Sequence, residues 1–136
     1  MTVEKTPLDA EMMQRARELI YDKVAQLQGV SMVEIENLLN ENKIVSERDP
    51  DMVHNIHGES ENIIFWLSDN EYVTKAVTSL IDEKKIFPHI TTFLVYIIDR
   101  KSLTLPMAKR NIQYKEPHWV PITLCTYPMP RKRNKK

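Results

Sequence analysis

The chain is poor in the residues that mark several common classes of protein. Among 136 residues there are one cysteine and two glycines, and aromatic residues make up 7%. Cys125 has no partner in the chain, which excludes an internal disulfide and favours a reducing compartment. The sequence has no glycine-rich phosphate loop, no nucleophile motif and no carboxylates that stand out as a catalytic pair. We therefore expect a protein that is not an enzyme and uses no cofactor.

Long apolar runs are missing as well. The longest, residues 93–98, is far shorter than the ~20 residues that cross a bilayer, and the first residues lack the pattern of a secretory signal. At 42% hydrophobic and 28% charged, the chain can still fill a core. We expect a cytoplasmic protein, with a single domain over residues 1–127 and a flexible basic tail over residues 128–136.

The net charge is zero, but the two signs are separated along the chain. Residues 1–99 contain 9 basic and 18 acidic side chains, a net charge of −9. Residues 100–136, called the basic segment below, contain 10 basic side chains and one acid, Glu116, a net charge of +9. Such a segment is typical of a chain that contacts a polyanion.

The first half of the chain predicts two helices joined by a tight turn. Apolar residues recur at helical spacing over residues 7–28, and Gly29 suits the left-handed position that ends a helix. Ser31 and Glu34 form a capping box for a second helix that ends near residue 41. Residues 43–62 are polar and rich in breakers, and they are predicted to form an insertion loop.

The second half predicts a strand, a helix and a hairpin. Residues 63–67 read as a short buried strand, and the capping box Ser68–Glu71 opens an amphipathic helix over residues 70–85. Strands are expected over residues 90–98 and 103–107, around a polar turn at residues 99–102. The buried stripe of the helix is Val73, Ala76, Val77, Leu80 and Ile81, and its polar side is Thr74, Lys75, Thr78, Asp82 and Lys85. Residues 119–124 are expected to form an extended segment that packs on the body.

This order of elements resembles the winged helix-turn-helix superfamily, most closely over residues 68–107. The resemblance implies an α+β fold with about three helices and a small antiparallel sheet, in which the hairpin forms the wing. In that family the last helix enters the major groove, and the wing contacts the DNA backbone or the minor groove. The implied function is a small DNA-binding protein, either a transcriptional regulator or an accessory factor of a mobile element.

The candidate DNA-binding residues come from the last helix and from the basic segment. Carried onto this chain, the resemblance gives Asn70, Thr74, Lys75 and Thr78 on the helix, and Arg100 and Lys101 on the wing. The charge pattern adds Lys109, Arg110, Arg131, Lys132 and Arg133, which can neutralise phosphates. The chain is thus predicted to bind duplex DNA.

Two other functions stay open at this point. The winged-helix fold by itself does not determine function. The chain can therefore also be a protein–protein interaction module, in which the acidic body, residues 1–99, contacts a basic partner. The tail and Trp119 can also bind RNA, by charge and stacking.

Three smaller expectations concern single residues. His54 and His57 lack the spacing of a metal site, so a polar loop without metal is expected. Cys125 is expected to be a buried, inert thiol. Met13, Ile20 and Leu27 stand at about heptad spacing on the first helix and predict a homodimer seam over residues 7–28.

Overall fold

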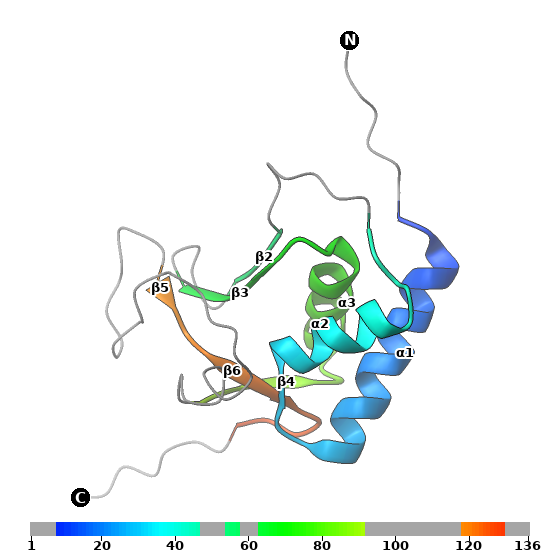
Figure 1. The fold of residues 1–136 in the computed structure, drawn as a ribbon. Coiled ribbons are helices and arrows are strands. Elements are labelled where there is room, and N and C mark those ends of the chain that lie inside the picture. The colour runs from blue at the N-terminus through cyan, green and yellow to red at the C-terminus, as the bar shows by residue number, and fades with distance from the viewer. Residues whose placement is uncertain (1–7, 47–53, 58–62, 92–117, 130–136) are drawn as a thin grey trace, which may run out of the picture.

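The computed structural model describes residues 8–46, 54–57, 63–91 and 118–129, which form three helices and two small sheets (Figure 1). The helices are α1 (Ala10–Leu27), α2 (Met32–Glu41) and α3 (Glu71–Asp82). The first sheet contains β1 (Val30–Ser31), β6 (Ile122–Cys125) and β4 (Phe87–Ile90), in this spatial order. The second contains β2 (His54–His57), β3 (Ile63–Ser68) and β5 (His118–Trp119), also in this order. The expected α+β class is confirmed.

The first two helices begin and end at the residues that cap them. The Asp9 side chain accepts a hydrogen bond from the Met12 backbone N–H at 3.0 Å, so α1 begins at Ala10 rather than at residue 7. Ser31 Oγ accepts from the Glu34 N–H at 3.2 Å, as the capping box predicts. Between the helices, Gly29 has φ 83°, the left-handed conformation expected of it. None of the described helices has the length and hydropathy that a membrane crossing requires.

The first sheet joins strands that lie far apart in the sequence. β6 is the central strand and pairs antiparallel with both β1 and β4. Pro88 lies in β4, an edge strand, where the backbone N–H that proline lacks is not needed for pairing. The prediction that a strand begins at residue 90 is wrong, because β4 begins at Phe87 and ends at Ile90. Residues 92–107, which contain the predicted turn and second strand, lie outside the described residues.

Two strands of the second sheet, β2 and β3, lie between α2 and α3 in the sequence, and its third strand, β5, follows β4. β2 pairs antiparallel with β3, and β3 pairs in parallel with β5. The prediction that residues 43–62 form only a loop is wrong, because β2 lies within this range and buries Ile56. A single apolar residue among polar ones has no visible period, so local pattern could not reveal this strand. The strand predicted over residues 63–67 is confirmed as β3, which extends to Ser68.

All three helices and both sheets contribute to one hydrophobic core. Trp66 of β3 is fully buried and lies against Trp119 of β5, with ring centroids 6.3 Å apart. Burying a large apolar side chain typically contributes about 1.5–3 kcal/mol. Both tryptophans thus lie in the core, and the expected packing of the extended segment near residues 119–124 is confirmed.

Candidate nucleic-acid interface

The helix predicted to contact DNA, α3, lies in the middle of the protein. It runs from the end of β3 to the start of β4 and contacts α1, α2, β2 and β3 (Figure 1). Of its four candidate residues, Lys75 and Thr78 are exposed. Asn70 is only 3% exposed and Thr74 only 7%. The first pair can therefore contact a ligand from the protein surface, whereas the second pair cannot.

Asn70 caps α3 and is fully engaged inside the protein. Its Oδ1 accepts hydrogen bonds from the Tyr72 N–H at 3.1 Å and from the Ser46 N–H at 3.2 Å. Its Nδ2 donates to the Ile44 carbonyl at 2.9 Å. The prediction that Asn70 reads DNA is corrected, because the amide satisfies buried backbone groups of two chain segments. Thr74 is also buried, so the prediction that it contacts DNA is wrong as well.

Further buried hydroxyls surround this cap. Ser68, which the capping box made the expected cap, instead uses its Oγ to accept from the Asn70 N–H at 3.1 Å. The same hydroxyl donates to the Glu36 carboxylate of α2 at 2.8 Å. Ser46 Oγ accepts from the Glu71 N–H at 2.8 Å. Sequence reasoning missed Glu36 and Ser46, since nothing in their local patterns indicates that α2 and the following segment meet α3 here.

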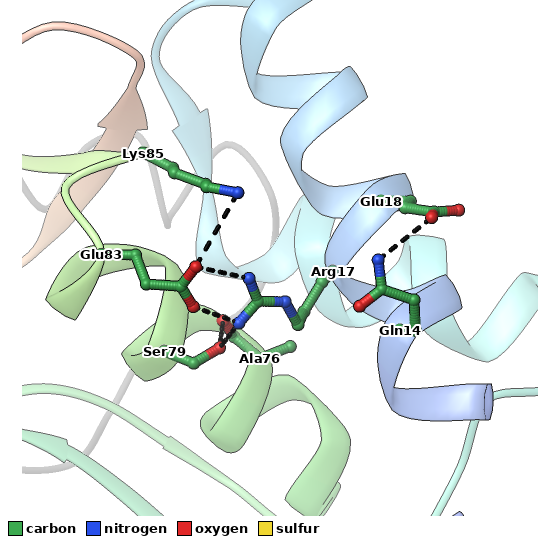
Figure 2. A network of polar contacts seen from close by, with 7 residues as sticks. All are labelled: Gln14, Arg17, Glu18, Ala76, Ser79, Glu83 and Lys85. Carbon is green, nitrogen blue, oxygen red and sulfur yellow. Dashed lines mark hydrogen bonds and ion pairs between the residues drawn. The ribbon is translucent and has the colours of Figure 1, made fainter. Parts of the chain in front are cut away.

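The opposite end of α3 is held by an exposed ion pair with α1 (Figure 2). Arg17 Nη1 and Nη2 donate to the two carboxylate oxygens of Glu83, the second at 2.8 Å. Arg17 Nη1 also donates to Ser79 Oγ at 2.8 Å, and Ser79 Oγ in turn donates to the Ala76 carbonyl at 2.9 Å. Lys85 Nζ lies 3.8 Å from Glu83 Oε1. These bonds join α1 to the last turn of α3.

The Arg17–Glu83 pair shifts the titration of both partners. The hydrogen bond from Arg17 holds the pKa of Glu83 below its usual value of 4.5. The same hydrogen bond raises the pKa of the Arg17 guanidinium above its ordinary value. Because Glu83 is exposed to solvent, the pair has only a modest effect on stability.

An open cleft of about 490 Å³ lies beside this ion pair. Its lining residues are Gln14, Arg17, Glu18, Tyr21 and Asp22 of α1, with Leu80 and Lys85. Both of its cations, Arg17 and Lys85, face Glu83, while Glu18 and Asp22 add negative charge. The charge balance of the cleft therefore does not suit DNA.

Most of the predicted cationic sites lie outside the described residues. These are Arg100, Lys101, Lys109, Arg110, Arg131, Lys132 and Arg133. Over the described ranges, no group of three or more His, Cys, Asp and Glu side chains is placed to hold a metal ion. Cys125 is buried as expected, and its hydrogen bond with Tyr127 raises the pKa of that phenol.

The homodimer seam predicted on the first helix is not a surface feature. Ile20 is fully buried, and Met13 is partly buried against the core. Only Leu27 of the three is exposed, at 58%. Ile20 and Met13 therefore pack against the core, and Leu27 alone of the three lies on the surface.

The comparisons with known proteins give no family. Neither the protein-family models, nor the curated proteins, nor the solved structures contain a match to this chain.

Proposed function

We propose that this chain is a winged-helix protein that binds duplex DNA through its basic segment and α3. The connections between its elements support the fold. β1 lies between α1 and α2, as a short strand does in winged helices, and it joins β6 and β4 in one antiparallel sheet. β4 directly follows α3, the position from which a wing begins. β2 and β3 are then an insertion between the second and third helices.

The observation that carries the proposal is the position of the basic residues, which lie between two paired strands in the sequence. β4 and β6 are antiparallel neighbours, and their pairing ends with Ile90 opposite Ile122. The chain that links these two strands contains Arg100, Lys101, Lys109, Arg110 and Lys115, against Asp99 and Glu116. In a winged helix this connection is the wing; in this chain it also contains β5, which pairs with β3 of the second sheet. The cations thus belong to the connection that the family uses against the DNA backbone.

The mechanism is non-covalent. Cations of the basic segment displace counterions from the phosphates, which makes the affinity fall as salt rises. Lys75 and Thr78, exposed on α3, add donors for phosphate oxygens. Asp82 and Glu83 lie at the C-terminal end of α3, where their negative charges disfavour contact with phosphates. We therefore expect α3 to approach DNA through its middle turn.

Fluorescence anisotropy of a labelled duplex, titrated at several salt concentrations, tests this function. We expect binding at low salt, with log K decreasing linearly with log salt. The double variant Arg100→Ala with Lys101→Ala removes two phosphate contacts and should reduce the slope by about 1.8, at ~0.9 per phosphate. The charge-matched control is Arg15→Ala with Lys43→Ala, two exposed cations outside α3 and the basic segment, which should leave the slope unchanged.

Two outcomes contradict the proposal: no binding at low salt, or equal slopes for the wing variant and its control. Either result favours the protein-interaction function instead. One observation already supports that second candidate, since the exposed face of α1 carries Glu11, Glu18 and Asp22. Such a face is complementary to a basic partner, and a pull-down after nuclease treatment would retain that partner.

A further inference from the structure

The cleft beside the Arg17–Glu83 pair runs along one side of α1. Its α1 residues recur every three or four positions and therefore share a face of the helix: Gln14, Arg17, Glu18, Tyr21 and Asp22. Leu80 of α3 and Lys85, which follows that helix, complete the lining. From residue 14 to residue 22 an α-helix rises by about 12 Å. A groove of this length accommodates roughly three to four residues of an extended peptide, at ~3.3 Å each.

The two cations of the cleft are engaged within the protein. Arg17 donates to both carboxylate oxygens of Glu83 and to Ser79 Oγ, and Lys85 Nζ lies 3.8 Å from Glu83 Oε1. Figure 2 shows the guanidinium turned toward Glu83. An anionic ligand would have to compete with this carboxylate for both cations. The cleft is therefore a poor site for a phosphate or a carboxylate.

The carboxylates of α1 on the same face are open to a ligand. Glu18 and Asp22 are both exposed. The Glu18 carboxylate accepts from the Gln14 amide at 3.1 Å (Figure 2), and among the described residues the Asp22 carboxylate forms no hydrogen bond or ion pair. With Glu83, the cleft has three carboxylates against two cations, a net charge of −1. The last turn of α3, which carries no basic residue, adds the negative end of a helix dipole. This balance suits a cationic ligand.

An aromatic ring lies beside these carboxylates. Tyr21 directly precedes Asp22 and follows Glu18 by three positions on α1, and it is 39% exposed. The face of its ring can attract a Lys or Arg cation and cover the aliphatic stem of that side chain. Leu80, only 2% exposed, adds apolar surface on the core side. A cation on an aliphatic stem therefore fits the cleft better than a bare metal ion.

We propose that this cleft binds a short basic segment of another protein, whose Lys or Arg side chains pair with Glu18 and Asp22 and lie against Tyr21. The two carboxylates are about one helical turn apart, with ~5–6 Å between their Cβ atoms. Alternate residues of an extended chain are separated by about 6.6 Å and point to the same side. The matching segment is therefore extended and carries cations at alternate positions. The site is separate from the DNA contacts proposed above and does not depend on them.

Fluorescence anisotropy of the labelled peptide Gly-Arg-Leu-Arg-Gly, titrated with the full chain, tests this site. The peptide Gly-Glu-Leu-Glu-Gly is the control of opposite charge. The titration is done at about 0.15 M salt, where charges beyond ~8 Å are screened. We expect saturable binding of the Arg peptide and no binding of the Glu peptide.

Variants of the two carboxylates locate the site. Glu18→Gln with Asp22→Asn should weaken binding of the Arg peptide about fivefold, at roughly two- to threefold for each exposed ion pair. The charge-matched control is Glu41→Gln with Asp69→Asn, which removes two exposed carboxylates outside the cleft and should leave the affinity unchanged.

Variants of the ring test the role of Tyr21. Tyr21→Ala should weaken binding roughly two- to fivefold through loss of the cation–π contact, whereas Tyr21→Phe keeps the ring face and should keep the affinity. Circular dichroism verifies that each variant is folded, which is expected because all the substituted side chains are exposed.

Several results would overturn the proposal. Equal binding of the two peptides, or equal affinities for the cleft variant and its control, would show that the two carboxylates do not form the site. Peptide binding that appears only after residues 130–136 are deleted would assign the cleft to the basic end of this chain. A dimer that dissociates in the cleft variant, detected by analytical ultracentrifugation, would assign the cleft to a second copy.

Discussion

At its N-terminus α3 is held by buried hydrogen bonds of Asn70, whereas at its C-terminus it is held by the exposed ion pair of Arg17 and Glu83. A buried amide that satisfies backbone groups responds little to salt or pH, because no solvent ion competes with it. An exposed ion pair responds to both. Since the buried end fixes α3, a salt titration of the proposed DNA binding would report on the proposed phosphate contacts rather than on movement of the helix.

The largest effect should follow from breaking the buried end. Asn70→Ala removes the cap of α3 and leaves the Ile44 carbonyl and the Ser46 N–H without their partner. We expect a loss of about 3 kcal/mol in the free energy of unfolding, from one cap and two buried polar groups. Urea unfolding followed by tryptophan fluorescence measures it. Lys75→Ala on the same helix is the exposed control, at about 0.5 kcal/mol or less. Equal losses for the two variants would show that the buried hydrogen bonds of Asn70 stabilise the fold no more than the exposed Lys75 side chain does.

A smaller effect is expected at the exposed end. Arg17→Ala removes the bonds to Glu83 and Ser79, and its stability loss should be well under half of that for Asn70→Ala, because exposed ion pairs contribute little. The loss should shrink further in 1 M NaCl, where charges are screened within ~3 Å. Arg17→Lys keeps the charge but not the two-pronged geometry, so it should be intermediate. A loss that is unchanged by salt would mean that Arg17 acts by packing rather than by charge.

The smallest effect concerns pH. The pKa of Glu83 is lowered in the folded protein by the Arg17 hydrogen bond, so ionised Glu83 contributes stability above its ordinary pKa of 4.5. That contribution is lost as pH falls from about 4.5 through the lowered pKa. Glu83→Gln should therefore be less stable than the natural chain at pH 7, and the two should converge at strongly acidic pH. A difference that is constant over this window would contradict the assignment of the shift to Glu83.

Local pattern was sufficient for the three described helices but not for every cap, because α3 is capped by Asn70 rather than by Ser68. The capping box at Ser31 and the left-handed Gly29 were predicted correctly, because both depend on groups a few positions away. β3 was also predicted, since its run of apolar and aromatic residues is typical of a strand. Strand β2 was not, because only its pairing with β3 and the burial of Ile56 define it.

Which residues of the candidate site are exposed could not be predicted from local sequence pattern. Amphipathic spacing put Thr74 on the polar side of its helix together with Lys75 and Thr78, but only the latter two are exposed. The resemblance predicts that Asn70 contacts DNA from the surface, yet its amide donates to the Ile44 carbonyl, 26 positions earlier in the chain. The period of a helix tells which residues share a side; it does not tell how many neighbours cover that side.

The separation of charge at residue 100 was determined by the sequence alone, since it is a count along the chain. So were the three helices of the described residues and their approximate bounds, because helix period acts within a few residues. The tertiary structure decided how the strands pair and which polar residues of α3 reach the surface. Those features depend on contacts between distant segments, such as α1 with α3 and β6 with both β1 and β4.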